Sequence, residues 1–212
     1  MPSLTRAPGA GRAQRDERRE AVERRVLSAV DELLGGGATF TELAVQRIAA
    51  EADIARSTFY RYFPDKSRLL IRMAELATDD QFSAAEQWWS GSHADGEDGV
   101  VHAMRLMIEG SRPHAQLLRA LSEVSTYDPD VGQYWRGRIA SFVALVCERL
   151  HTDQSAGRLP ARVDITATAI VLTCMVERSI DFLLGTEAVT DEQMARSLGR
   201  AIWLTTYGDA PA

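Results

Sequence analysis

Cysteine is scarce in this sequence of 212 residues, and neither of its two copies belongs to a recognisable cysteine motif. Cys147 and Cys174 each lie inside an apolar helical pattern, away from any C-x-x-C pair or histidine-rich cluster. A buried free cysteine usually behaves as a small hydrophobic residue. The sequence therefore predicts two structural thiols, with a redox switch as the weaker alternative.

Long apolar runs are also missing. The longest mostly apolar stretch, from Ala167 to Val176, ends at Glu177 and Arg178, and it is far shorter than the roughly 20 residues that a membrane-spanning helix needs. The first 15 residues mix proline, glycine and arginine without the apolar centre of a secretory signal. We therefore expect a soluble, cytoplasmic protein with no membrane partner.

Motifs of catalysis are absent as well. The sequence has no G-x-S-x-G, H-E-x-x-H, phosphate-loop or dinucleotide-binding glycine pattern. A helical di-iron site would need two Glu-x-x-His pairs, and only Glu148-x-x-His151 is present, because the residues three before the other histidines are Ser90, Gly99 and Ser111. We expect no catalytic residue, no metal and no cofactor, and a helical metal-dependent enzyme is a remote alternative.

Positive charge is in deficit overall, but not at the start of the chain. The net charge is -6 at pH 7, yet residues 1–70 carry 12 Lys/Arg against 10 Asp/Glu while the remainder carries 12 against 20. A DNA-binding protein needs cations only on the surface that meets the duplex, and an acidic remainder repels DNA from the other surfaces. The charge distribution therefore allows a nucleic-acid partner for the N-terminal part.

Helical periodicity is what the sequence does contain. Apolar residues recur every three or four positions, and no strand-like alternation persists. The expected helices cover residues 18–34, 45–52, 56–63, 65 to as far as 89, about 100–112, 113–125, 130–151, 164–185 and 191–207. The helix at 164–185 is apolar on nearly every side, which predicts burial on more than one face.

These segments predict an all-α protein in three parts. We expect a flexible N-terminal arm at residues 1–15, and then a three-helix DNA-binding domain with a helix-turn-helix at residues 16–70. A larger helical domain for ligand binding and dimerisation would occupy residues 71–212.

The two short helices at 45–52 and 56–63 carry the strongest functional signal. In a helix-turn-helix the second helix enters the major groove while the first braces it against the DNA backbone. Phe59 and Phe63, four residues apart, would face inward, and the opposite stripe would present donors and aromatic edges to bases and phosphates. The expected DNA-contacting residues are Gln46, Arg47, Arg56, Ser57, Thr58, Tyr60, Arg61, Tyr62 and Lys66.

Taken singly, these residues have plainer interpretations, because Tyr60 and Tyr62 are also compatible with partly buried core aromatics. Together, the pattern Thr58-x-Tyr60-x-Tyr62-Phe63 followed by Lys66 closely resembles the signature of the tetracycline-repressor (TetR) family of transcription regulators. The likeness covers about residues 18–70, and the later helices agree in number and order with the larger variable domain of that family.

The helix-turn-helix departs from the family pattern at three positions. Asp53 occupies a turn where the family often has glycine, and Ala44 and Ala55 stand where serine or threonine would cap the two helices. Asp tolerates a left-handed turn, whereas alanine at an N-cap costs about 1 kcal/mol and offers no hydroxyl to a phosphate. Thr41 is an alternative cap one turn earlier.

The second half resembles the EthR-like group of the same family. The likeness rests on Met175-x-Glu177-Arg178, on Trp135 after Tyr134, and on Ile202-Trp203 followed by Tyr207-Gly208. It implies a helical homodimer with an apolar, aromatic-lined tunnel in each subunit. Thr173 and Val176 align with two asparagines that line that tunnel, so amide contacts to a ligand are not carried over.

An apolar pocket is therefore expected in the second half, although the same residues could fill a solid core instead. Methionine and tryptophan suit a deformable apolar cavity with indole donors. The candidate pocket residues are Trp88, Trp89, Met104, Met107, Ile108, Trp135, Phe142, Thr173, Val176, Ile180 and Trp203.

The expected function is that of a homodimeric repressor, which a small apolar or aromatic effector releases from a double-stranded DNA operator with inverted symmetry. Two alternatives remain within the family: an activator, or a regulator without a small-molecule effector.

Overall fold

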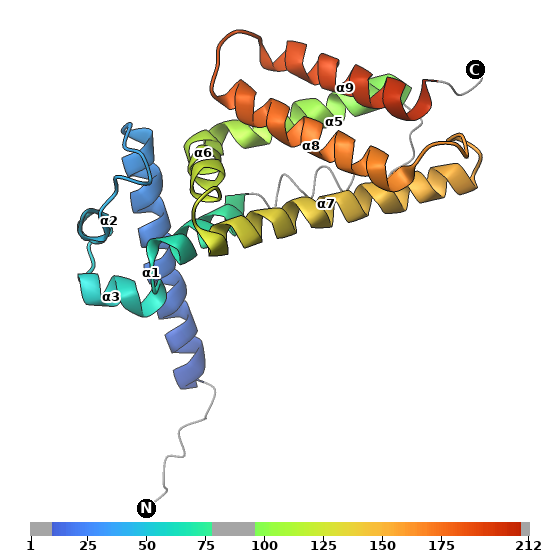
Figure 1. The fold of residues 1–212 in the computed structure, drawn as a ribbon. Coiled ribbons are helices and arrows are strands. Elements are labelled where there is room, and N and C mark those ends of the chain that lie inside the picture. The colour runs from blue at the N-terminus through green and yellow to red at the C-terminus, as the bar shows by residue number, and fades with distance from the viewer. Residues whose placement is uncertain (1–9, 78–95, 209–212) are drawn as a thin grey trace, which may run out of the picture. The chain divides into compact units, whose positions relative to one another are not determined.

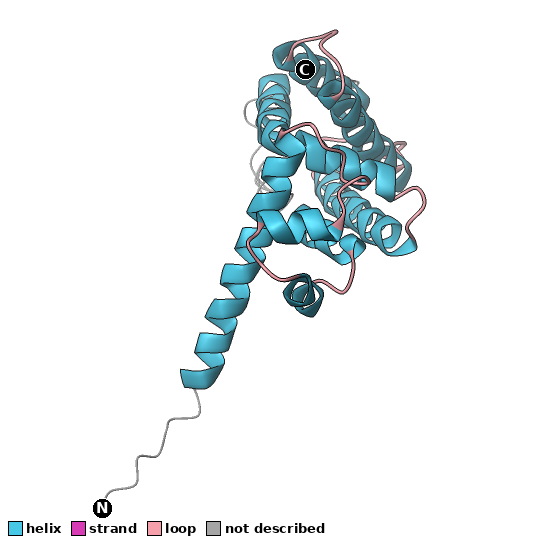
Figure 2. Ribbon diagram, turned by 90° about the vertical axis from the view of Figure 1, so that its left-hand side faces the viewer, coloured by secondary structure: helices cyan, strands magenta, loops and turns pink. Residues whose placement is uncertain are grey.

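Helices make up the regular structure of the chain. The computed structural model describes residues 10–77 and 96–208, and within those ranges Figure 2 shows helices and loops without a strand. The helices in Figure 1 are α1 (Ala10–Gly35), α2 (Val45–Glu51), α3 (Arg56–Tyr62), α5 (Gly96–Ser111), the 3-10 helix η1 (Arg112–His114), α6 (Ala115–Val124), α7 (Pro129–Ser155), α8 (Ile165–Leu184) and α9 (Asp191–Tyr207). The all-α expectation is confirmed.

One further helix begins at Lys66 and is described as far as Ala77. Residues 78–95 lie outside the described ranges, so the expected continuation towards Trp89 is not described. No described helix is both long enough and apolar enough to cross a membrane.

The chain divides into two compact units, and the boundary lies between Leu70 and Ile71. In the first unit, α1 buries Val22, Val26, Val30 and Leu33, which recur at the helical spacing expected for this segment. The helix begins eight residues before the expected Arg18, at Ala10, because most residues before the first buried position are Arg, Glu, Ala or Gln, which are good helix formers. It therefore includes residues 10–15 of the segment expected to be an arm.

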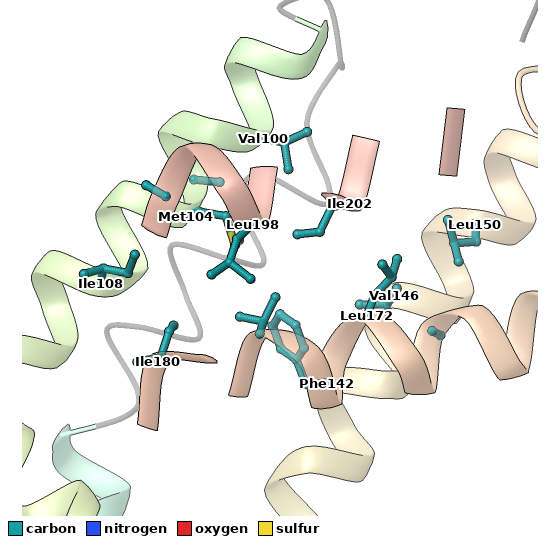
Figure 3. Packing of buried hydrophobic residues seen from close by; sticks show 14 of the residues in the cluster. Val100, Met104, Ile108, Phe142, Val146, Leu150, Leu172, Ile180, Leu198 and Ile202 are labelled. Carbon is teal, nitrogen blue, oxygen red and sulfur yellow. The ribbon is translucent and has the colours of Figure 1, made fainter. Parts of the chain in front are cut away.

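The second unit is built on two helix pairs, since α5 packs against α9 and α7 packs against α8. Figure 3 shows how their side chains meet in one core. The core residues labelled there are Val100, Met104 and Ile108 from α5, Phe142, Val146 and Leu150 from α7, Leu172 and Ile180 from α8, and Leu198 and Ile202 from α9.

Contact between α5 and α9 is close because Gly199 has no side chain. A Cβ added at Gly199 would lie 2.8 Å from the Cα and backbone nitrogen of Val101. Arg105 ties the same pair together by donating to both carboxylate oxygens of Glu192, at 2.8 and 3.1 Å. These hydrogen bonds, together with one from Arg196 at 2.7 Å, lower the pKa of Glu192 to about 2.

Polar caps define where the long helices begin. Asp128 accepts hydrogen bonds from the first turn of α7, in which Pro129 occupies the first position. Asp164 caps α8 in the same way. α9 begins with a capping box, because Thr190 and Gln193 exchange hydrogen bonds between side chain and backbone.

One apolar face of α8 is buried in the core, and a second one is not. Ile180, Leu172 and Leu183 are buried, whereas Val171 is 58% exposed and Phe182 67% exposed. Ile170, Val171, Cys174 and Phe182 share this outer face, which we call the α8 outer face. The expectation of burial on more than one face is therefore not met within a single chain.

A buried polar cluster closes the end of the second unit where α7 and α9 meet. Asp153, which is fully buried, accepts a hydrogen bond from the hydroxyl of Tyr207 at 2.5 Å. It also accepts from Arg158 at 2.7 Å and from Arg149 at 3.2 Å. Burial alone would raise the pKa of Asp153, but these donors outweigh it and the pKa lies below its usual value.

Candidate DNA-binding surface and ligand cavity

The turn between α2 and α3 depends on Asp53. Its φ is +49°, the left-handed conformation that was expected to be tolerable for aspartate. The backbone nitrogen of Ile54 then donates to the carbonyl of Ala49 at 2.9 Å, which closes the end of α2. Arg25 of α1 donates to the carbonyl of Asp53 at 3.4 Å, so the turn is also held from the long helix.

α3 is two-faced, as its sequence predicted. Phe59 and Phe63 are buried, with ring centroids 5.6 Å apart. On the opposite side, the polar residues Arg56, Ser57, Tyr60 and Arg61 are exposed, and Thr58 and Tyr62 are half-buried between the two faces. The surface made by the four exposed residues is called the reading face below.

The reading face carries one preformed contact. Nη2 of Arg56 donates to the hydroxyl of Tyr60 at 3.4 Å, and its guanidinium carbon lies 5.5 Å from the centroid of the Tyr60 ring. A guanidinium stacked on an aromatic ring loses less side-chain freedom on binding. The arrangement suits bidentate contacts to guanine or phosphate.

α2 adds two exposed polar residues, Gln46 and Arg47. Ala44 and Ala55 stand at the N-caps of α2 and α3, where no side chain caps the helix. The absence of capping hydroxyls was expected from the sequence.

Lys66 is the only lysine of the chain, and its ammonium group is held by the protein itself. Nζ donates to the carbonyl of Phe40 at 2.7 Å and to that of Thr41 at 3.0 Å, and it lies 5.0 Å from the centroid of the Phe40 ring. Burial lowers the pKa of Lys66. Two of the three N–H donors of the ammonium are thus engaged inside the unit, which leaves one for a phosphate.

The second unit contains a cavity of about 90 Å³ between α5, α6, α7 and α8. Most of its lining is apolar, and the polar atoms come from two serines, a threonine and two carboxylates. The lining residues are Met107, Ser111, Leu118, Ser122, Trp135, Ile139, Phe142, Thr173, Val176, Glu177, Ile180, Asp181 and Leu184.

The structure brings six of the candidate pocket residues together around this cavity: Met107, Trp135, Phe142, Thr173, Val176 and Ile180. Met104 and Ile108, on the same helix as Met107, are buried in the core and do not line the cavity. Trp203 also lies outside the lining; its ring packs against the core and lies 4.7 Å from that of Tyr207. Trp88 and Trp89 are outside the described residues.

The polar side of the cavity was missed by sequence reasoning. Thr173, Glu177 and Asp181 are spaced by four residues on α8 and therefore share one stripe that reaches the lining. The sequence held a signal for it, because Glu177 lies within the motif that carries the family resemblance, but apolar periodicity predicts only the apolar part of a lining. The other lining residues that were not anticipated are Ser111, Leu118, Ser122, Ile139 and Leu184.

Thr173 and Glu177 each lack part of the polar surroundings that their side chains would have in water. The Thr173 side chain is buried, and its hydroxyl has no hydrogen-bond partner. Burial raises the pKa of Glu177, an effect that Arg178 and a hydrogen bond from Trp135 reduce. No group of histidine, cysteine, aspartate and glutamate residues suited to a metal ion occurs within residues 10–77 and 96–208.

Two family models match the chain. The model for the C-terminal domain of the transcriptional regulator EthR matches residues 100–208, which include the cavity. The model for bacterial regulatory proteins of the tetR family matches residues 39–73, which include α2, α3 and Lys66.

Whole-chain comparison gives the same result. The HTH-type transcriptional regulator EthR of Mycolicibacterium smegmatis is 26% identical over 215 residues, covering 99% of this chain and 96% of that protein. EthR of Mycobacterium tuberculosis is 23% identical over 211 residues, covering 98% and 95%. Both relatives are regulators of transcription and not enzymes.

Solved structures show the same fold at lower identity. Native NalD of Pseudomonas aeruginosa, the secondary repressor of the MexAB-OprM multidrug efflux pump, aligns with a TM-score of 0.73 at 16% identity, covering 90% of this chain and 99% of that one. A TetR-family regulator of Syntrophomonas wolfei aligns with a TM-score of 0.68 at 17% identity, covering 90% and 95%.

Proposed function

This chain belongs to the TetR family of DNA-binding transcriptional regulators, with a C-terminal domain of the EthR type, and from that premise we propose that it is a homodimeric repressor released from its operator by a small ligand. The observation that carries the ligand-response part is the cavity in the second unit, since six residues selected for a pocket line it.

For DNA binding, the proposal places α3 in the major groove. The exposed Arg56, Ser57, Tyr60 and Arg61 would contact base edges and phosphates, and Gln46 and Arg47 of α2 would contact the backbone. Thr58, Tyr62 and Lys66 would support these contacts from the edges of the reading face.

Arg61→Ala tests this surface, with Arg136→Ala as the matched control. Both arginines are exposed and both changes remove one positive charge, but Arg136 lies on α7 in the second unit. Arg61→Ala should weaken binding to a selected inverted-repeat operator by about 1–3 kcal/mol if the guanidinium contacts a base. Equal affinity of the two variants in a titration at fixed salt would contradict the proposal.

The α8 outer face supports the dimer. Ile170 is 46% exposed, and Leu204 on neighbouring α9 is 51% exposed. A two-fold dimer through α8 and α9 would cover these side chains and would explain why α8 is apolar on nearly every side. It would also present two reading helices to half-sites about 34–36 Å apart, or a multiple of that spacing.

For the switch, the proposal is that ligand binding favours a conformation with low DNA affinity. A ligand changes DNA affinity only if it binds the two conformations unequally, and a typical coupling of about 1–3 kcal/mol corresponds to a roughly 5- to 150-fold change. The helix that begins at Lys66 continues past the division between the units. It is therefore the covalent connection through which the two can be coupled.

Val176→Trp tests the cavity against the solid-core alternative. An open cavity would accept the indole, so the variant should keep its fold and its operator affinity but lose its response to ligands. In a solid core the same change should cost about 1–3 kcal/mol or more. A clear drop in melting temperature, together with a parent protein that no apolar ligand stabilises in a thermal-shift screen, would leave a regulator without an effector.

The direction of regulation is tested separately. If the unliganded protein raises transcription from its operator in a purified transcription assay, the protein is an activator, and the repressor part of the proposal fails while its DNA-binding surface stands.

A further inference from the structure

The polar groups of the cavity are arranged for a particular kind of ligand. We propose that the effector is a cationic amphiphile, with a protonated amine between the carboxylate of Glu177 and the hydroxyl of Thr173 and an apolar, preferably aromatic body against Trp135 and Phe142. This inference rests on the proposed function, because it assigns a chemical class to the ligand of the same cavity.

Charge balance at the cavity is the first argument. Glu177 and Asp181 both line it, and Arg178 pairs with Asp181 at 2.9 Å, with 70% of the arginine side chain exposed. Two carboxylates and one guanidinium leave a net negative charge on this stretch of α8. Nearby Arg119 donates to the carbonyl of Leu184 at the C-terminal end of α8, at 2.9 Å, and the charges that shift the pKa of Glu177 are those of Arg178 and Asp181.

A buried hydroxyl without a hydrogen-bond partner is the second, independent argument. The Thr173 side chain is only 4% exposed, lines the cavity, and its hydroxyl has no hydrogen-bond partner. A buried hydroxyl without a partner costs free energy until a ligand or water satisfies it. Thr173 and Glu177 lie four residues apart on one helical face, so a single ammonium can reach both.

The state of Glu177 points in the same direction. Burial raises the pKa of its carboxyl, although Arg178 and the indole of Trp135 partly stabilise the charge. Because the pKa remains raised, the interactions with Arg178 and Trp135 do not fully replace the hydration that the carboxylate loses on burial. A ligand cation would supply the missing interaction, whereas a ligand carboxylate would be repelled.

Aromatic side chains complete the site. Trp135 and Phe142 come from α7 and face the α8 stripe across the cavity, and an aromatic ring face adds attraction for a nearby ammonium. The cavity volume of about 90 Å³ is below the roughly 300–1,000 Å³ of pockets for drug-sized ligands. A ligand with one ring and a short chain therefore fits only if lining side chains move outward, and Met107 is the lining residue best able to do so.

Matched probes test the charge. Phenylpropylamine, phenylpropanol and phenylpropanoate differ mainly in the terminal group, and calorimetric titration into the full-length protein at neutral pH measures their affinities. We expect the amine to bind about 10- to 100-fold more tightly than the alcohol, the range of one charge-assisted hydrogen bond, and the carboxylate to bind most weakly. Glu177→Gln should abolish the advantage of the amine over the alcohol.

Glu148→Gln is the control, because Glu148 is an exposed helical glutamate on α7 outside the lining. Its preference for the amine should equal that of the parent. If alcohol and amine bind equally, or if Glu177→Gln keeps the preference, the cationic ligand is excluded while the cavity remains a ligand site. If no probe binds the parent and Val176→Trp melts at a lower temperature, the cavity itself is excluded, and the ligand-release part of the proposed function fails with it.

Discussion

Lys66 connects two segments that lie far apart in the sequence. Its ammonium donates to the carbonyls of Phe40 and Thr41, at 2.7 and 3.0 Å. Lys66 therefore holds the loop before α2 against the first turn of the helix that follows α3. The sequence predicted a phosphate contact for this residue, and that contact remains a prediction. The structure adds a positioning role, which has a different experimental signature.

Lys66→Met separates the two roles. Methionine keeps the apolar stem but leaves two carbonyls without their charged donor, so the free energy of unfolding should fall by about 1–3 kcal/mol. If Lys66 acts only by positioning α2, operator affinity should fall while the salt dependence of binding stays the same. A decrease of the salt slope by about one unit would identify a phosphate contact. A variant with unchanged stability would contradict the positioning role.

Tyr207→Phe tests the buried cluster around Asp153. The change removes a hydrogen bond to a charged carboxylate, and it should lower the free energy of unfolding at pH 7 by about 1.5–3 kcal/mol. Tyr127→Phe is the control, because Tyr127 is 59% exposed and should tolerate the change. Equal melting temperatures for the two variants would show that the cluster does not stabilise the fold.

The same cluster predicts a dependence on pH. The pKa of Asp153 in the folded state lies below its ordinary 3.8, so its contribution is present above that pH and is lost as the pH falls through the folded-state pKa. Burial and the Asp153 carboxylate raise the pKa of Tyr207 above 10.0, so its contribution is lost only as the pH rises well beyond 10. Urea unfolding curves from pH 2 to 7 should show the destabilisation caused by Tyr207→Phe shrinking at the acid end.

At the scale of elements, Gly199 determines how closely α5 and α9 approach. Gly199→Ala would place its Cβ 2.8 Å from the backbone of Val101, and it should cost about 1–3 kcal/mol because two backbones must separate. Gly137→Ala on α7 is the matched control. A Cβ there meets nothing within 4 Å, so the change should stabilise the helix by roughly 0.5–1 kcal/mol. A stabilised Gly199→Ala variant would disprove the close contact.

Most helices were predictable because their apolar periodicity and caps are local. The capping box at Thr190 and the left-handed turn at Asp53 follow from residues within a few positions of each other. The start of α1 at Ala10 was not predictable from periodicity, since its first turns are polar.

Other features could not be predicted, because they depend on contacts between residues that lie far apart in the sequence. The bond from Lys66 to Phe40 spans 26 residues and that from Tyr207 to Asp153 spans 54, and neither pair has a local signature. In the cavity, helical spacing selected Met107 but could not distinguish its face of α5 from that of Met104, which is turned into the core.

At the scale of the whole molecule, the α8 outer face determines the expected assembly. Phe182→Glu places a charge on a side chain that is 67% exposed in the single chain, so the monomer should fold normally. A dimer through α8 would bury this charge, and light scattering at micromolar concentration should then detect a monomer with weakened operator binding. Leu106→Glu on α5, at a position 41% exposed, should remain dimeric. A dimeric Phe182→Glu variant, or a monomeric parent protein, would contradict the assembly.

A protein with a single lysine has only one side-chain amine, and here that amine lies inside the DNA-binding unit, at Nζ of Lys66. Isotope-labelled lysine supplied during expression would therefore introduce one lysine side-chain signal into the whole molecule, without any mutation or chemical modification of the ammonium. Its chemical shift would report whether the loop before α2 is in place when ligand is added to the cavity of the second unit. The chain thus carries its own spectroscopic probe for communication between its two units.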